Sequence, residues 1–252
     1  MKKIIDGQQI HKSFATDKKK VNVLRDVSVS LYEGEFISVM GPSGSGKSTL
    51  LYALSGMDTI DSGEVIFNSQ SLTACGETEL SDIRRQQMGF VFQQPTFLKN
   101  LTIIDNIVLP AMRDNRKKRK SIVNNAQQLL EKTGIGDLAY RMPNQVSGGQ
   151  LQRAGICRAL INEPKIIFGD EPTGALNSKS AEEIMRYFLQ TNQAGMTILL
   201  VTHDAKVAAQ SERVLFMKDG QIVDELQLGK LSNQVLDNRI EKVTRKMLKV
   251  EM

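Results

Sequence analysis

The sequence has few cysteines, no long apolar run and only a small excess of positive charge. Cys75 and Cys157 lie far apart, with no second cysteine or histidine at metal-ligand spacing, so we expect free thiols rather than a disulfide or metal site. MTILLV (196–201) is among the longest apolar stretches, whereas a membrane-spanning helix needs about 18 to 20 such residues. We therefore expect any role at a membrane to depend on a partner.

The N-terminal segment and the charged residues narrow the class of protein further. Near its start the chain has Lys2 and Lys3, but Asp6 and Gln8 follow before an apolar core develops, so we expect no signal peptide. The 33 basic and 28 acidic residues give a net charge of +5, and much of the excess lies in two runs, at 18–20 and 113–120. Such runs are usually solvated, so we expect no nucleic-acid binding.

Strand-like and helix-like patterns alternate along the chain. Strands are predicted at 23–31, 36–40, 63–68, 88–93, 165–168, 197–202 and 213–223, the last interrupted by a hairpin turn at Asp219-Gly220. A helix is predicted from about Gly46 to Ser55, and residues from about 94 to 165 have a helical texture in which Ser121 caps one helix and Gly134 ends it. The order predicts an α/β fold with a mainly parallel sheet and a helical insertion.

The C-terminal residues form a separate pattern after Gly229. Apolar residues recur at helical spacing, at Leu236, Ile240, Val243, Met247 and Val250, with basic residues between them. We expect a terminal helix that docks on its own domain. A basic contact with a partner or with the inner membrane surface is the alternative interpretation.

The stretch GPSGSGKST (41–49) matches the complete phosphate-binding pattern G-x-x-x-x-G-K-[ST] between a predicted strand and a predicted helix. Glycines let backbone amides turn toward phosphates, and the helix N-terminus adds its positive end. Lys47 supplies a point charge for the β- and γ-phosphates, and Ser48 a hydroxyl ligand for Mg²⁺. A glycine-rich structural turn is the alternative, but the flanking elements favour nucleotide binding.

Other polar residues follow predicted strands, where open α/β sheets place their ligand-binding groups. Asp170 is suited to hold Mg²⁺, and Glu171 beside it to act on an attacking water. His203 and Gln93 end their strands in the same way, and Gln93 could reach metal and water. An isolated acidic pair or histidine is often structural, but these follow a phosphate loop in a sheet of this order.

A second glycine turn, VSGGQ (146–150), begins another predicted helix and is a second potential anion cradle. Together these motifs resemble the ATP-binding-cassette family, specifically the nucleotide-binding subunit of an ABC transporter, over about residues 4–228. The resemblance implies a P-loop NTPase (RecA-like) core with an antiparallel β subdomain and an inserted α-helical subdomain at about 94–165. An ABC ATPase domain would then span 1–228, and an amphipathic helical extension 229–252.

The resemblance also implies residue roles. Phe14 would stack on adenine, and Asp170 would join Ser48 and Gln93 at Mg²⁺. The residues expected to contact the ATP phosphates in the loop are Gly41, Ser43, Gly44, Ser45, Gly46, Lys47, Ser48 and Thr49. The residues expected to act in hydrolysis are Glu171, His203, Lys47 and Gln93.

In this family the signature motif, here Ser147, Gly148, Gly149 and Gln150, contacts the ATP bound to the other subunit. The resemblance therefore implies a homodimer around two ATP, beneath a membrane permease at the inner face of the cell membrane. Two positions depart from the family pattern. Val146 stands where leucine is usual, and Asn177 where an aspartate usually faces the partner subunit, which puts communication between the two sites in question.

The segment EPTGALNSKS (171–180) looks most like the lipoprotein-release, macrolide-export and antimicrobial-peptide-resistance subgroup. This favours export, or resistance to antimicrobial peptides or related amphiphiles, and residues 94–110 lie in the family's permease-contact region. Two alternatives are a soluble ABC ATPase of DNA repair or translation and a non-hydrolysing regulatory module. The single cassette without a cysteine cluster argues against the first, and the presence of Glu171 and His203 against the second.

Overall fold

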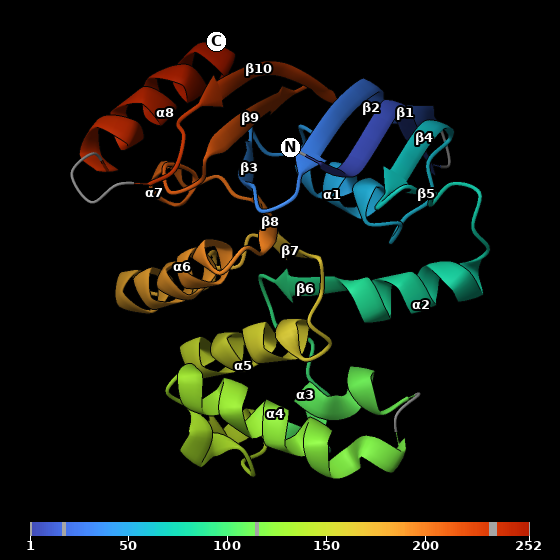
Figure 1. The fold of residues 1–252 in the computed structure, drawn as a ribbon. Coiled ribbons are helices and arrows are strands. Elements are labelled where there is room, and N and C mark those ends of the chain that lie inside the picture. Colours follow the sequence, from blue (N-terminus) through green and yellow to red (C-terminus); the bar gives the residue numbers. More distant parts are fainter. Residues whose placement is uncertain (1, 17–18, 114–115, 232–235, 252) are drawn as a thin grey trace. The chain divides into compact units, whose positions relative to one another are not determined.

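The computed structural model describes residues 2–16, 19–113, 116–231 and 236–251 (Figure 1). The chain divides into two units, one formed by the residues up to Leu80 and from Asn192 onward, the other by Ser81–Thr191. The first boundary between the units, at Leu80 and Ser81, lies within helix α2 (Glu77–Gln87). Within the described ranges, no helix combines the length and the apolar character that crossing a membrane requires.

The first unit contains an antiparallel sheet with the strand order β2-β1-β4-β5. Its strands are β1 (Lys3–Thr16), β2 (Lys19–Tyr32), β4 (Ser62–Phe67) and β5 (Gln70–Ser71). The alternation predicted for 23–31 is present in β2, where Leu24, Val27 and Leu31 are buried. A bulge at Asp26 (φ 53°) adds one residue to β2, which is why Leu24 and Val27 both face the core although they are three positions apart.

The same unit contains mainly parallel strands. β3 (Phe36–Met40) runs parallel to β8 (Thr197–Val201) on one side and to β9 (Arg213–Lys218) on the other, and β10 (Gln221–Gln227) returns antiparallel to β9. Every residue of β3 and β8 is buried, as expected for parallel strands covered on both faces. The helices of this unit are α1 (Lys47–Leu54), α7 (Ala205–Ala208) and α8 (Leu236–Glu251).

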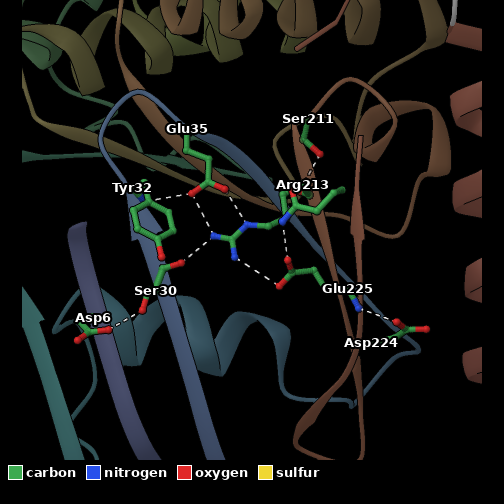
Figure 2. A network of polar contacts seen from close by, with 9 residues as sticks. Asp6, Ser30, Tyr32, Glu35, Ser211, Arg213, Asp224 and Glu225 are labelled. Carbon is green, nitrogen blue, oxygen red and sulfur yellow. Dashed lines mark hydrogen bonds and ion pairs between the residues drawn. The ribbon is translucent and has the colours of Figure 1, made fainter. Parts of the chain in front are cut away.

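A buried ion pair ties the two groups of strands together inside the first unit, as Figure 2 shows. The guanidinium of Arg213 donates to both carboxylate oxygens of Glu35, at 2.7 and 3.0 Å, and to the carbonyl oxygen of Ser30 at 2.7 Å. Glu225 lies 3.4 Å away. Since Ser30 belongs to β2 and Arg213 to β9, one side chain joins the antiparallel sheet to the parallel strands.

Helix α8 packs on its own unit. Ile240, Val243, Met247 and Val250 turn inward against α7, β9 and β10, while Leu236 is 37% exposed. Arg239 is also buried, and its guanidinium donates to carbonyl oxygens of Ala209, Ser211, Gly229 and Lys230. The helix is therefore held by an apolar stripe and by one buried cation.

The second unit combines two parallel strands with a helical cluster. β6 (Met88–Phe92) pairs with β7 (Ile166–Asp170). The helices are α3 (Ile103–Met112), α4 (Arg119–Lys132), α5 (Gly148–Leu160) and α6 (Ser178–Gln193), with 3-10 turns η1 (Arg116–Lys118), η2 (Gly136–Leu138) and η3 (Pro143–Gln145). α3, α4 and α5 enclose an apolar core that includes Cys157. Burial raises the pKa of that thiol to about 11, so Cys157 is a packing residue, as expected from the sequence.

One predicted helix boundary is wrong. Ser121 does not cap α4, which begins at Arg119 with Lys118 in the cap position. The 3-10 turn η1 runs directly into the helix, so the helix starts before a side-chain cap becomes available. The predicted end is confirmed, because Gly134 follows the helix in the left-handed region (φ 66°).

Candidate functional site

The loop at 41–49 connects β3 to α1 in the first unit. Gly46 precedes α1 in the left-handed region (φ 98°), and a Cβ there would lie 2.8 Å from the carbonyl oxygen of Val23. A side chain at this position would meet both backbone strain and backbone atoms, so the loop needs glycine. At the exposed tip, a Cβ on Gly44 would meet no atom within 4 Å. The loop is thus held firmly against β2 and is open at its tip, which fits an anionic group at the N-terminus of α1.

The side chain of Lys47 lies against its own loop and is largely buried. Its Nζ donates to the carbonyl oxygens of Gly41 at 2.9 Å and Pro42 at 2.8 Å. Ser48 and Thr49 follow in the first turn of α1, both partly exposed. One ammonium and two hydroxyl groups therefore sit at the helix N-terminus, a chemistry suited to a triphosphate and a hard cation.

The β9–β10 turn is hydrogen-bonded to the loop at 41–49. Asp219 and Gly220 both have positive φ angles (49° and 80°), which confirms the predicted hairpin. The amide of Gly220 donates to the carbonyl oxygen of Ser45 at 3.1 Å, and its own carbonyl accepts from the amide of Arg25 at 2.9 Å. The turn therefore joins the phosphate loop to β2 through backbone groups, a role that the D-G pattern alone does not reveal.

Phe14 lies on β1 of the first unit with 43% of its surface exposed. It pairs with Val21 on β2, and Val23, two residues further, contacts Gly46 of the phosphate loop. Two residues of extended strand span roughly 7 Å. A short stretch of β2 thus connects Phe14 to the loop at 41–49. A site for a nucleotide requires such closeness between the group that binds the base and the groups that bind the phosphates.

His203 is exposed in the same unit, between β8 and α7. Its neighbours fix the backbone on both sides. The amide of Asp204 donates to the hydroxyl of Thr202 at 3.0 Å, and the carboxylate of Asp204 caps α7 by accepting from the amide of Lys206 at 2.7 Å. The histidine therefore stands on a short loop of defined shape.

In the second unit, Gln93 and the acidic pair lie together at the carboxyl ends of two parallel strands. Phe92 pairs with Asp170, so Gln93 and Glu171 each come directly after this pair. A Cβ on Gly174 would lie 3.0 Å from Nε2 of Gln93 and 3.2 Å from Oε2 of Glu171. Both side chains thus flank one small residue, a role of Gly174 that was not predicted from the sequence.

Glu171 adopts a left-handed conformation (φ 47°), which costs a residue with a side chain of order 1 kcal/mol or more. Gly174 completes the turn by donating its amide to the carbonyl of Glu171 at 3.0 Å. Such strain persists where the surrounding structure requires it, and it concentrates at functional sites.

The signature residues form the N-terminus of α5. The hydroxyl of Ser147 accepts from the amide of Gln150 at 3.3 Å, and Oε1 of Gln150 accepts from the amide of Ser147 at 2.8 Å, a complete capping box. Ser147 and Gly148 are exposed. Val146 packs against the helical core, so valine meets the apolar requirement of that position.

Helix α5 also reaches the end of β6. Gln152 is fully buried, and its Nε2 donates to the carbonyl oxygen of Phe92 at 2.8 Å, next to Gln93. Gly149 contacts α6 instead, because a Cβ there would lie 2.8 Å from Oγ of Ser180. Helix α5 therefore contacts both the end of β6, next to Gln93, and the first turn of α6.

Comparison with known proteins gives a consistent family. The family model described as "ABC transporter" matches residues 24–174. Over 240 residues the chain is 41% identical to the bacitracin export ATP-binding protein BceA of Halalkalibacterium halodurans, covering 95% of this chain and 94% of that protein. Over 232 residues it is 40% identical to the macrolide export ATP-binding/permease protein MacB of Aggregatibacter actinomycetemcomitans, covering 92% of this chain but only 36% of that longer protein.

A solved structure extends the comparison to the fold. The dimeric post-hydrolysis state of the ATP-binding cassette MJ0796, bound to ADP and Pi, superimposes with a TM-score of 0.80 at 36% identity, covering 90% of this chain and all of that one. The fold predicted from the sequence is confirmed by this likeness.

Proposed function

The chain belongs to the ABC transporter family as one of its ATP-binding, ATP-hydrolysing subunits, and we propose that it works as a homodimer that encloses two ATP with Mg²⁺ and drives a separate permease. The observation that carries the proposal is the presence in one chain of two glycine-containing turns that lead into helix N-termini, those of α1 and α5, each suited to an anion. Each would serve a different nucleotide. The dimeric form of MJ0796 supports this arrangement.

The first helix N-terminus would hold the subunit's own ATP. Amides of the loop at 41–49 would bind the phosphates together with Lys47, and Phe14 would stack on adenine. Ser48, Gln93 and Asp170 would hold Mg²⁺, and they offer the hydroxyl, amide and carboxylate oxygens that this cation prefers. Bound Mg²⁺ supplies neutralisation of the phosphate charge.

Hydrolysis would depend on groups of this chain that act on water and phosphate. Glu171 would orient the attacking water and accept its proton, with Gln93 beside it on the other side of Gly174. His203 and Lys47 would bind the transferred phosphate, where negative charge must be stabilised. The carboxylate and the carboxamide are already close to one another in the second unit.

The second helix N-terminus would bind ATP held by the partner subunit. The capping box occupies the amides of Ser147 and Gln150, so those of Gly148 and Gly149 remain for an external anion. The Ser147 hydroxyl accepts one hydrogen bond and keeps its own proton to donate. The exposed motif thus retains donors for a γ-phosphate.

The transport role rests on the relatives. BceA and MacB are both named for export, and MacB joins its ATP-binding part to a permease in one chain. We propose that this chain instead binds a separate permease at the cytoplasmic face of the membrane and serves export, or resistance to antimicrobial peptides or related amphiphiles. Leu98 and Leu109, each 50% exposed in the expected permease-contact region, support such a docking surface.

Glu171→Gln tests the proposal, because it removes the carboxylate base but keeps the side chain's shape. We expect ATP binding to persist, turnover to fall by about 10²-fold or more, and a stable dimer to form in Mg-ATP. Size-exclusion chromatography with light scattering measures the dimer. Lys47→Ala is the control, expected to bind ATP poorly and to stay monomeric. A Glu171→Gln chain that remains monomeric in saturating Mg-ATP would contradict the sandwich.

A further inference from the structure

We infer that Lys12 is a positioning residue for nucleobase binding, because it holds the ring of Phe14 in place and fastens it to the segment that follows α1. The inference rests on the proposed function, in which Phe14 stacks on adenine. Lys12 lies two residues before Phe14 on β1 and is largely buried, which is rare for a lysine.

The ammonium of Lys12 lies among polar groups and against the ring of Phe14. Its Nζ donates to Oδ1 of Asp58 at 2.7 Å and to the carbonyl oxygen of Thr59 at 2.5 Å, and it lies 4.9 Å from the centroid of the Phe14 ring. A buried ammonium bonded to a carboxylate and a carbonyl has a fixed position. A cation at this distance from a ring centroid is attracted to the ring's electron-rich face, so a fixed ammonium also orients the ring.

The segment that receives Lys12 is itself firmly attached. The hydroxyl of Ser13 donates to the carboxylate of Asp61, and the amide of Asp61 donates to the carbonyl oxygen of His11 at 2.8 Å. This segment continues directly from α1, the helix that begins at the phosphate loop. Through Lys12 the ring is therefore connected to the segment that follows the helix whose N-terminus would hold the phosphates.

The register of β1 explains how a lysine reaches this place. The pairing of β1 with β2 shifts on both sides of Lys12, which pairs with Leu24. Such irregularities redirect side chains, and here the side chain of Lys12 reaches Asp58 and Thr59 in the segment after α1. Phe14 still keeps 43% of its surface exposed, so the ring remains accessible to a base while its orientation is restricted.

The test separates base binding from phosphate binding. ATP and inorganic tripolyphosphate, each with Mg²⁺, are titrated calorimetrically into the full-length protein and into the variants Lys12→Met, Phe14→Ala and the double variant. We expect Lys12→Met to weaken ATP binding about five- to tenfold and to leave tripolyphosphate binding unchanged. Because Lys12 acts through the ring, the double variant should be no weaker than Phe14→Ala alone.

Lys20→Met is the matched control. Lys20 belongs to the same hairpin and lies 3.7 Å from Asp61, but its side chain is 70% exposed, so its removal should change neither affinity. Should Lys12→Met fail to fold, Asp58→Asn weakens the same anchor and keeps its shape. That variant should weaken ATP binding by a smaller factor and spare tripolyphosphate.

Three other results of these titrations would contradict either the role of Lys12 or that of Phe14. Equal losses for ATP and tripolyphosphate would make Lys12 a purely structural residue. Unchanged ATP binding in Lys12→Met, together with a loss in Phe14→Ala, would refute the positioning role and leave the proposed function intact. Unchanged ATP binding in Phe14→Ala would remove the aromatic platform itself, and the inference with it.

Discussion

Asn177 caps helix α6 at the scale of a single residue, since its Oδ1 accepts from the amide of Ser180 at 2.9 Å. The family resemblance leads us to expect an aspartate at this position, so the question is what the chain loses with the charge. Asparagine and aspartate are about equally good N-caps, so the local structure does not depend on the missing charge. Ser180 also lies beside Gly149, which places this cap next to the signature helix.

Asn177→Asp should therefore keep the cap and add a favourable charge at the N-terminus of α6, raising the free energy of unfolding by up to about 1 kcal/mol. Asn177→Ala should lower it by about 1 kcal/mol, because the amide of Ser180 loses its acceptor. Urea unfolding of both variants measures the difference. Equal stabilities for the alanine variant and the parent would show that the cap contributes nothing.

Helix α8 shows how a buried cation adds to an apolar stripe in holding an element in place. The carbonyl groups that Arg239 binds come from the end of α7 and from the segment after β10. Burial lowers the pKa of Arg239, yet the guanidinium stays charged because its ordinary value is so high. Its removal would leave the buried carbonyl oxygens of Ala209 and Ser211 without this donor.

Arg239→Met should lower the free energy of unfolding by roughly 2 kcal/mol or more, since the stem still fills space but the hydrogen bonds are lost. Arg245→Met on the same helix is the control, because Arg245 is 75% exposed and its ion pair with Glu241 is worth less than about 1 kcal/mol. Hydrogen exchange along α8 and urea unfolding both measure the effect. Similar losses in the two variants would contradict the role of Arg239.

Elements with strong local patterns could be predicted from the sequence. The buried strand at 36–40, the hairpin at Asp219-Gly220 and the helix that starts near Gly46 all appear where expected. Helix α2 was not predicted, because Ile83 is its only buried residue and it therefore lacks an apolar face. Local patterns identify elements where apolar residues form a continuous or a periodic run, or where a turn has a typical sequence.

Within the candidate site, too, some residues could be predicted from the sequence and others could not. Residues within one motif could be predicted, because a contiguous loop or strand end has a chemistry of its own. Three residues could not be predicted in this way. Lys12 and Gln152 each bond a partner that is distant in sequence, and Gly174 matters because it has no side chain between Gln93 and Glu171. The bond from Lys12 to Asp58 joins residues 46 positions apart, and no local spacing specifies such a contact.

At the scale of the whole molecule, the proposed active unit is a pair of chains. Lys47→Ala would disable the phosphate loop of one chain, and Ser147→Arg the signature of the other. Each variant alone should be inactive, because every site that two of its chains could form would contain the damaged motif. In a mixed dimer, however, one site would combine an intact phosphate loop with an intact signature.

Equal amounts of the two inactive variants should therefore regain activity when mixed, up to about a quarter of the parent ATPase rate if sites act independently. A phosphate-release assay on the mixture measures the gain. Lys47→Ala mixed with itself at the same total concentration is the control. No gain in a mixture that demonstrably forms mixed dimers would show that the signature does not act across the subunits.

The β9–β10 turn has a practical consequence for anyone who wishes to label or tag this protein. Polar hairpin tips are ordinarily the first choice for inserted epitopes and fluorescent probes, and Asp219-Gly220 looks like such a site in the sequence. Here the amide of Gly220 supports Ser45, and a Cβ on Gly220 would lie 2.4 Å from the carbonyl of Val23. An insertion at this tip would displace the loop at 41–49, which we propose binds ATP.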